Sequence, residues 1–169
     1  IYVRALIFTF AFAFAATTLE LLLGLAVALL LADKQINMRI SSASRTLMMI
    51  PFVIAPVVVS YAYKTLIYDG TFGYLNFALR ALGLPQFFVF EGAVNAPLAL
   101  LFMEVMLRTP FVVLIIYAGI MTVSTDMLDA AEVDNATGFR KVIHVILPTI
   151  LPVIMDAYIL RFMDALKMY

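Results

Sequence analysis

The chain has 169 residues, of which 65% are hydrophobic and 13% are charged. Soluble domains are about half apolar, and here the apolar residues form long unbroken runs, so a water-soluble protein is excluded. The formal net charge is zero, which provides no overall attraction to nucleic acid or to anionic lipid. The absence of cysteine excludes disulfides and thiolate metal sites.

Four stretches of the chain are long and apolar enough to cross a membrane. A hydrocarbon core about 30 Å thick needs about 20 apolar helical residues, and the matching windows are residues 5–32, 46–66, 96–121 and 149–168. The first two contain almost no charge, whereas the last two carry several charged residues. The sequence therefore predicts an all-α, polytopic membrane bundle with about four spans.

The connections between these windows indicate their orientation. Residues 33–45 contain three Lys or Arg residues and one acid, and short loops rich in Lys and Arg stay on the cytoplasmic side. Residues 68–97 have Arg80 as their only Lys or Arg and are rich in Gly, Asn, Pro and aromatic residues, which indicates an interfacial segment on the outer side. Alternation then places the connection 122–147 in the cytoplasm.

Prolines interrupt the apolar windows at Pro51, Pro56, Pro110, Pro148 and Pro152. Each removes a helical hydrogen-bond donor and favours a kink. Membrane helices tolerate such kinks when neighbouring groups or water satisfy the freed carbonyls, which is compatible with a bundle around an interior cavity. It is equally compatible with the sequence that these prolines are ordinary residues of membrane helices with no role in transport.

The cytoplasmic connection contains a short predicted helix. It begins near Asp126 with acidic residues in its first turn, Ser124 or Thr125 is its predicted cap, and Gly138 is its predicted break. Small or apolar residues recur on one face at spacings of three and four, at Leu128, Ala131, Asn135 and Phe139. A short polar helix with such a face predicts a protein partner.

The stretch DAAEVDNATGFRKVIHVILP, residues 129–148, has a specific spacing. It resembles the cytoplasmic EAA loop of permease subunits from binding-protein-dependent ABC importers, whose pattern is E-A-A, three residues, G, nine residues and I-x-L-P. Here Asp129, Ala130 and Ala131 stand for E-A-A, Asn135 for the Gly, and residues 145–148, with Leu147 and Pro148, for I-x-L-P. Asn replaces Gly at position 135, and it is the residue that best tolerates a positive φ after Gly.

The resemblance covers most of the chain and favours the carbohydrate branch, the permeases of the maltose and glycerol-3-phosphate kind. GTFGYLNFALRALGL, residues 70–84, is similar to their external G-x-x-N segment, and ILRFMDALKMY, residues 159–169, is similar to their last helix before an external turn. Such permeases have at least six spans. Residues 1–169 are therefore expected to form a single transmembrane permease domain that is incomplete at both ends.

The resemblance implies a function for the loop 122–147. It would form a coupling helix that docks in a groove of a cytoplasmic ATPase subunit, with Asp129 reaching a donor there and Ala130 and Ala131 allowing close approach. Asp134, Asn135, Gly138, Leu147 and Pro148 complete the predicted ATPase-coupling site. The shorter carboxylate of Asp129, compared with Glu, reduces its reach.

The resemblance also implies the assembly and the transport. The partners would be a second permease subunit, two cytoplasmic ATPase subunits, an external substrate-binding protein and membrane lipid, in a bacterial or archaeal plasma membrane. The substrate would be a sugar or related polyol, moved by alternating access. The chain would need no cofactor and would not be an enzyme, because ATP hydrolysis resides on the partner.

Several polar residues inside the apolar windows are candidates for the translocation path. An ionisable group in the bilayer is costly unless it is paired or hydrated, so these residues are expected to face the bundle interior. Glu104 and Arg108 are four residues apart and are predicted to pair. The predicted substrate path comprises Glu104, Arg108, Tyr117, Asp156 and Tyr158. The alternative, that the charged residues lock helices together, is equally compatible with the sequence.

Other functions have less support in the sequence. His144 is the single histidine, and no ligand set predicts a metal site; the motifs of nucleotide-binding loops and common hydrolases are absent. An ion-coupled carrier, with Glu20, Glu104 and Asp156 as a relay, remains the first alternative. A membrane enzyme with Asp156 and Asp164 as an acid/base pair is the second.

Overall fold

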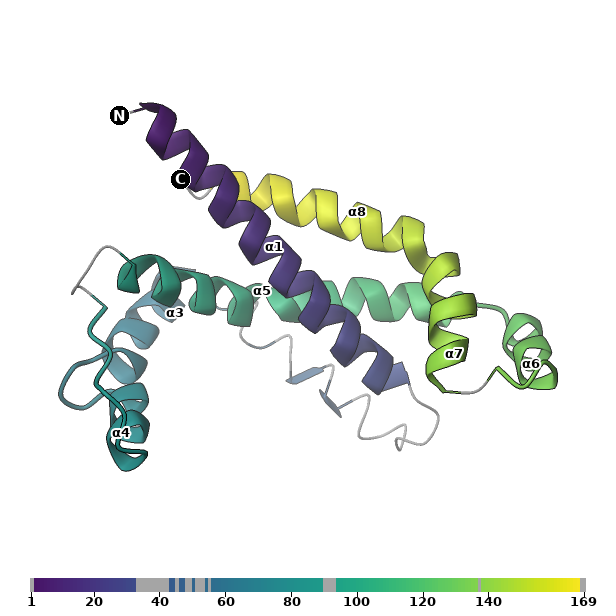
Figure 1. Ribbon diagram of the computed structural model, residues 1–169, viewed down its shortest axis with the longest axis horizontal. Helices are drawn as coiled ribbons and strands as arrows, with labels where there is room; N and C mark the ends of the chain where they lie inside the picture. The colour runs from purple at the N-terminus through teal and green to yellow at the C-terminus, as the bar shows by residue number, and fades with distance from the viewer. Residues whose placement is uncertain are drawn as a thin grey trace.

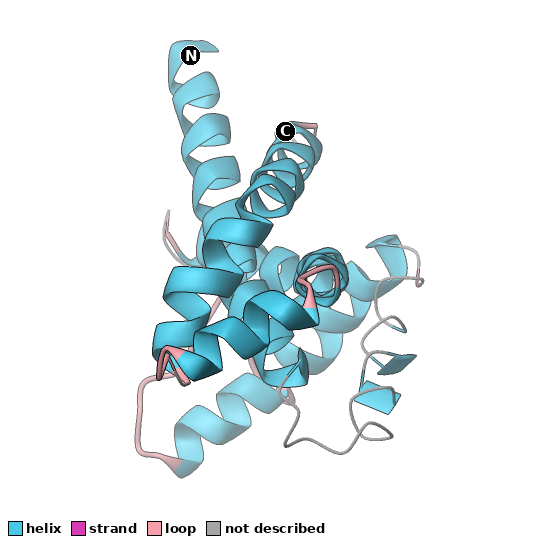
Figure 2. Cartoon of the chain, turned by 90° about the vertical axis from the view of Figure 1, so that its right-hand side faces the viewer, coloured by secondary structure: helices cyan, strands magenta, loops and turns pink. Residues whose placement is uncertain are grey.

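The computed structural model of the chain describes residues 2–32, 43–44, 46–47, 50, 54, 56–89, 94–136 and 138–167. Within these residues the structure consists of helices and loops without strands (Figure 2). The long helices are α1 (Tyr2–Ala32), α5 (Asn95–Met121) and α8 (Leu147–Leu166). The shorter ones are α3 (Pro56–Ala62), the π-helical turn η1 (Tyr63–Ile67), α4 (Tyr74–Ala81), α6 (Thr125–Val133), α7 (Phe139–Lys141) and the π-helical turn η2 (Val142–Ile146). The all-α prediction is confirmed.

Three helices in the described part of the chain are long and apolar enough to cross a membrane. They are Tyr2–Ala32, Asn95–Met121 and Phe139–Leu166. The third is longer than the predicted window 149–168 because α7, η2 and α8 follow one another without a break. The predicted span 46–66 falls partly outside the described residues, and its second half is part of the apolar helix Val57–Ile67.

The three long helices pack side by side, with α1 lying across α5 and α8 beside them (Figure 1). The buried core joins the C-terminal parts of α1 and α5 to the first turns of α8, through Ala28, Ile116, Ile120 and Ile150 among others. The helices α1 and α5 therefore run in the same direction, and α8 runs in the opposite one. The end of α1 lies at the same end of the bundle as α6, which agrees with the orientation predicted from the basic loop.

Small residues permit this close packing. A Cβ atom added to Gly24 of α1 would lie 2.7 Å from Val112 Cγ1 of α5, and one added to Gly119 would lie 3.0 Å from Val153 Cγ1 of α8. Both distances are shorter than a normal contact between carbon atoms. Glycine at these crossings therefore lets the helix backbones approach, as is usual between helices in membranes.

Replacing Gly24 with Leu is expected to separate α1 from α5. Overpacking of a filled contact costs about 1–3 kcal/mol, and Val112 is only 1% exposed, so it has little room to move. This loss of stability should appear as a lower unfolding temperature of the protein purified in detergent. Ala26→Leu, on the exposed side of the same helix, is the matched control, and equal effects of both changes would contradict the close crossing.

The prolines of the long helices lie where the helices continue through them, at Pro110 in α5 and at Pro148 and Pro152 in α8. In both helices a threonine directly follows or precedes a proline and bonds to the backbone of its own helix. The Thr109 hydroxyl donates to the Val105 carbonyl at 2.6 Å, and Thr149 makes the same bond to Val145 at 2.6 Å. These hydroxyls supply bonds inside the helix, as expected where no water is present.

The segment between η1 and α5 folds into a compact lobe around Asn76. This side chain is fully buried, its amide nitrogen donates to the carbonyls of Asp69 (3.2 Å) and Phe87 (2.9 Å), and its oxygen accepts from the Phe87 amide at 2.7 Å. A Cβ atom at Gly73 would lie 2.4 Å from the Asp69 carbonyl oxygen. The Gly and Asn of the G-x-x-N segment therefore have structural roles. The glycine leaves room for the tight turn, and the asparagine holds the turn in place by hydrogen bonds.

Candidate functional site

Five charged residues from three helices meet inside the bundle: Glu20, Glu104, Arg108, Arg161 and Asp164, called here the charge cluster. Arg161 of α8 is its centre and is only 2% exposed. Its Nε donates to Glu20 Oε2 at 2.8 Å and its Nη2 to Glu20 Oε1 at 3.1 Å. This two-point geometry between guanidinium and carboxylate is the strong form of the ion pair.

Arg161 also binds the two other carboxylates. Its Nη2 donates to Glu104 Oε1 at 3.1 Å, and its Nη1 donates to Asp164 Oδ2 at 2.6 Å. Glu20 and Glu104 are buried, with 0% and 1% of their surface exposed. Because Glu20 belongs to α1, Glu104 to α5 and Arg161 to α8, the cluster ties the three long helices together.

The cluster has one accessible edge. The predicted pair of Glu104 and Arg108 forms, with 3.5 Å between Glu104 Oε1 and Arg108 Nε, and the Arg108 side chain is 22% exposed. The Asp164 side chain is 47% exposed. The buried part of the cluster is thus closed by ion pairs, while Arg108 and Asp164 can meet polar groups outside it.

The other predicted path residues lie apart from the cluster. The Tyr158 hydroxyl is 3.4 Å from the Thr18 hydroxyl, and its ring stacks on Phe162 at 6.1 Å between centroids. Tyr117 packs against the apolar core, and Asp156 is exposed on α8. The path through these residues stays a prediction.

The sequence-based site omitted the residues that hold the cluster together. Glu20, Arg161 and Asp164 were recognisable only as charges inside apolar windows, which must be paired or hydrated. Asp164 is three residues from Arg161, but the two buried partners, Glu20 and Glu104, are 141 and 57 residues away in the sequence, and the amino-acid pattern contains no information on such distant contacts.

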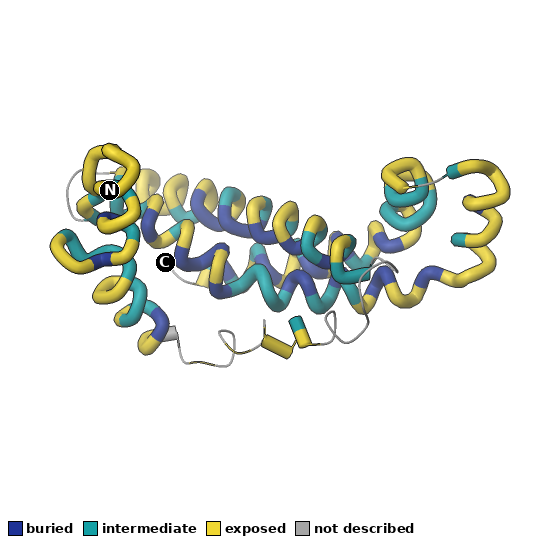
Figure 3. Tube along the Cα trace, turned by 90° about the horizontal axis from the view of Figure 1, so that it is seen from below, coloured by how far each residue is buried: buried dark blue, intermediate teal, exposed yellow. Residues whose placement is uncertain are grey.

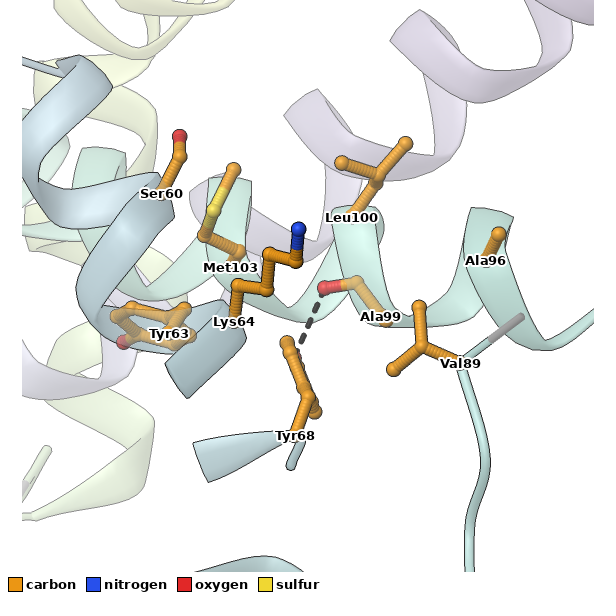
Figure 4. A pocket seen from close by; sticks show the side chains of 9 residues that line it. All are labelled: Ser60, Tyr63, Lys64, Tyr68, Val89, Ala96, Ala99, Leu100 and Met103. Carbon is orange, nitrogen blue, oxygen red and sulfur yellow. Dashed lines mark hydrogen bonds between the residues drawn. The ribbon is translucent and has the colours of Figure 1, made fainter. Parts of the chain in front are cut away.

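A separate pocket of about 230 Å³ lies between η1 and the first half of α5. Its lining includes Tyr63, Lys64, Tyr68, Ala99 and Met103 (Figure 4). The Tyr68 hydroxyl donates to the Ala99 carbonyl at 2.9 Å and fastens η1 to α5. None of the charge-cluster residues lines this pocket.

A short helix forms where the coupling helix was predicted, as α6, beyond the ends of the long helices. It ends at Val133 and not at the predicted break Gly138, so Asn135 and Phe139 do not belong to it. Ser124 is its cap and accepts a hydrogen bond from the Met127 amide at 3.4 Å. Asn135 ends it with a φ of 55°, the Ala136 amide donates to Ala131 at 2.8 Å, and the Asn135 amide donates to Glu132 at 3.1 Å. These two bonds form a Schellman motif, so the substitution of Asn for Gly keeps a left-handed helix end.

The faces of α6 differ in exposure. Asp129 and Ala130 are exposed, as is Asp134, whereas Ala131 is only 6% exposed and faces the rest of the chain. Exposed residues predominate along α6 in the burial view (Figure 3). Gly138, with a φ of 54°, starts α7, Leu147 packs partly against the core, and Pro148 is exposed in the first turn of α8. The predicted coupling residues therefore include both surface positions and structural ones.

Two contacts connect α6 to the helix that leads to the charge cluster. The Lys141 amine pairs with Glu132 Oε1 at 2.5 Å, and Leu128 packs against the core formed by α1, α5 and α8. The helix Phe139–Leu166 is continuous and contains Arg161. A displacement of α6 can therefore reach the charge cluster through one helix.

Substitutions at Asn135 test the helix end. Asn135→Gly should preserve or slightly increase stability, because Gly adopts a positive φ without strain. Asn135→Val should cost about 1–2 kcal/mol, the penalty of the left-handed conformation. Thermal unfolding of the two variants measures the difference, and a Val variant as stable as the Gly variant would contradict the observed φ.

The sequence match decides the family. Residues 20–169 match the family of binding-protein-dependent transport system inner membrane components. The chain belongs to this family. Membership confirms the prediction of a multi-pass permease subunit of the prokaryotic inner membrane, which rested on the apolar windows and on the resemblance of the cytoplasmic loop and two further segments.

Characterised relatives and solved structures agree with the assignment. The chain is 30% identical to the trehalose/maltose transport system permease protein MalF of Thermococcus litoralis over 151 residues, which cover 89% of the chain and 50% of that protein. It is 34% identical to the trehalose transport system permease protein SugA of Mycobacterium tuberculosis over 165 residues, which cover 98% of the chain and 51% of that protein. The chain thus spans about half the length of the curated relatives it matches.

A subunit of a bacterial alginate ABC transporter, solved in complex with an alginate-bound periplasmic protein, has the same fold. It matches with a TM-score of 0.77 and 21% identity, over 89% of the chain and 53% of that subunit. At this identity the likeness establishes the fold of an ABC importer transmembrane subunit and carries no information on the substrate.

Proposed function

We propose that this chain forms part of the membrane-spanning permease of an ATP-driven importer that translocates a sugar or related polyol delivered by an external binding protein. The observation that carries the proposal is α6, a short helix beyond the bundle that exposes Asp129 and Ala130 at the spacing of the EAA loop. A small residue permits close approach of a partner, and a charge fixes the register of docking. The family assignment supports this reading.

The proposed mechanism begins at α6. Closure of two ATPase subunits on ATP moves the docked helix, and the ion pair of Glu132 with Lys141 transmits the movement to the helix Phe139–Leu166. That helix contains Arg161, whose partners lie on α1 and α5. The three long helices then reorient together around a central path. No group of this chain takes part in hydrolysis.

The proposed partners are a second permease subunit, two ATPase subunits and the external binding protein. Large apolar side chains are exposed along α1, including Tyr2 at 86%, Ile7 at 64% and Leu22 at 59%. In a membrane such a surface contacts lipid or further helices. The proposed second permease subunit is one source of such helices.

Neutral sugars suit the charge cluster better than acidic ones. Three carboxylates (Glu20, Glu104, Asp164) face two guanidinium groups (Arg108, Arg161), a formal balance of 2 − 3 = −1. Arg161 is already bound by all three carboxylates, so it is not available to an anionic substrate. Relatives named for trehalose, maltose and diacetylchitobiose agree with a neutral oligosaccharide, whereas a relative that matches a shorter part of the chain is named for the sulfonated sugar sulfoquinovosyl glycerol. Tyr158 offers a ring for sugar faces.

The test is uptake into vesicles that contain the complete transporter. With ATP inside and the binding protein outside, radiolabelled trehalose or maltose should accumulate and should continue to do so after a protonophore is added. An alginate oligosaccharide should not accumulate. Uptake that follows a proton or sodium gradient without ATP would contradict the proposal.

An ion-coupled carrier has less support. It requires carboxylates that exchange protons or cations during transport, and Glu20 and Glu104 are both engaged by Arg161. Asp156, the third member of that relay, is exposed on α8. The same uptake experiment separates the two functions, because only the carrier loses its driving force with the protonophore.

A further inference from the structure

The helix α4 has an unusual distribution of polar and apolar residues. Its polar residue Asn76 is fully buried, whereas its outward residues, apart from Arg80, are apolar. Tyr74 is 70% exposed, Phe77 74%, Phe72 in the preceding turn 87%, and Leu82 just after the helix 74%. A helix on a water-facing surface shows the opposite arrangement. These four residues, three of them aromatic, are called here the aromatic face.

Arg80 supplies a positive charge beside the aromatic face. With Phe72, Tyr74, Phe77 and Thr71 it lines a shallow hollow of about 270 Å³. Its Nη2 donates to the Gly70 carbonyl at 3.1 Å, which holds the guanidinium at the surface. The patch thus combines large apolar groups with one fixed cation, the only Lys or Arg in residues 68–97.

The nearby acid does not cancel this charge by pairing with it. The Asp69 carboxylate accepts hydrogen bonds from the backbone amides of Phe72 (2.9 Å) and Thr71 (2.8 Å). Both bonds end on Oδ1 and lower the pKa of Asp69 below its ordinary value, so the carboxylate stays charged within its own turn. Among the described residues no ion pair joins Asp69 to Arg80, so the guanidinium at the surface can meet an external anion.

The position of α4 matches the boundary between hydrocarbon and water. The Tyr68 hydroxyl binds the Ala99 carbonyl, and the Asn95 amide donates to the Phe88 carbonyl at 2.9 Å. Both contacts fasten the lobe to the first turns of α5, where that spanning helix begins. The lobe lies at the end of the bundle opposite α6 (Figure 1).

We propose that the aromatic face of α4 lies in the lipid at the membrane surface opposite α6, with Phe72, Phe77 and Leu82 among the upper acyl carbons and Arg80 at the level of the lipid phosphates. Aromatic residues concentrate at this level of a bilayer, and a short helix with an apolar face lies in the interface plane. Guanidinium groups bind phosphate strongly. The lobe would then anchor the outer end of α5 to the membrane surface.

Spin labelling can locate this face. Residues 1–169 contain no cysteine, so Phe77→Cys provides one nitroxide site in a transporter whose other cysteines are replaced by serine. The complete transporter is placed in vesicles of phosphatidylethanolamine and phosphatidylglycerol, and collisions with oxygen and with a water-soluble nickel complex are measured. Tyr74→Cys on the same face serves as a second site if the first variant fails to assemble. Lipids labelled at the headgroup and in the middle of the acyl chain, together with a water-soluble nitroxide, are the membrane and aqueous references.

The proposal predicts a ratio of oxygen to nickel collisions several-fold above that of the water-soluble nitroxide, at a depth close to that of a lipid labelled at its headgroup. A ratio as low as that of the water-soluble nitroxide would place the face in water and overturn the proposal. Low collisions with both reagents and an immobilised spectrum would show that protein covers the face, which also overturns it. Neither outcome depends on which substrate the transporter carries.

Discussion

Replacing Arg161 with Met should prevent stable assembly of the permease. The substitution leaves Glu20 and Glu104, both buried, without their central cation. Removing one partner of a buried ion pair costs about 3–5 kcal/mol because the remaining charge is uncompensated. A loss of this size is comparable to the whole stability of many domains. The measurement is the yield and the thermal unfolding temperature of the transporter purified in detergent.

A compensated variant distinguishes the lost ion pair from lost packing. In Arg161→Met with Glu20→Gln and Glu104→Gln, no uncompensated carboxylate remains in the buried part of the cluster. Neutral replacements of a whole buried network are often tolerated, so the triple variant should be more stable than the single one. Lys167→Met, which removes an exposed cation just after α8, should have little effect. If the triple variant is as unstable as Arg161→Met, the charge cluster is not the reason for the loss.

The spans could be predicted from the sequence because their signal is local. Runs of apolar residues fixed the windows 5–32, 96–121 and 149–168 to within a few residues of the helices Tyr2–Ala32, Asn95–Met121 and Leu147–Leu166. The cap at Ser124 and the positive φ of Asn135 were also predictable, since both depend on the backbone preferences of one residue type.

The helix contacts could not be predicted in the same way. Helix periodicity indicates which residues share a face, but α1 shows little separation of polar and apolar residues, since all its faces are apolar. The crossing at Gly24 and the partners of Arg161 depend on which helix packs against which. The start of the third spanning helix at Phe139 could not be predicted either. The polar residues Arg140 and Lys141 of α7 interrupt the apolar pattern at the beginning of this helix.

The largest functional effect is expected from Asp129→Arg. The Asp129 carboxylate is exposed on α6, so charge reversal should leave the fold intact while placing a like charge against the proposed donor on the ATPase. Disrupting one charge pair at an interface costs about 2–5 kcal/mol, which corresponds to about 30-fold or more in affinity. The ATPase subunits should therefore be lost when the transporter is purified from membranes and its proteins are identified by mass spectrometry.

Asp129→Glu is the matched control, because it restores the side chain of the EAA pattern and extends the carboxylate by one methylene. It should retain the ATPase subunits at least as well as the unmodified protein. Retention of the ATPase subunits by Asp129→Arg would contradict the assignment of α6 as the docking helix. The ion-coupled carrier would then be favoured over the importer.

Substitutions at the neighbouring residues Ala130 and Ala131 can distinguish an effect on ATPase docking from an effect on folding. Ala130 is exposed, so Ala130→Leu should leave the thermal stability of the permease unchanged and weaken its docking to the ATPase. Ala131 is 6% exposed and its carbonyl accepts the closing hydrogen bond of the helix from Ala136, so Ala131→Leu should instead displace α6 from the chain beneath it. The two variants are therefore expected to differ. The Ala130→Leu permease should be stable but should not bind the ATPase, whereas Ala131→Leu should lower the unfolding temperature of the isolated permease. If Ala131→Leu uncoupled transport without any loss of stability, the inward position of Ala131 would be wrong, and both alanines would belong to the docking surface.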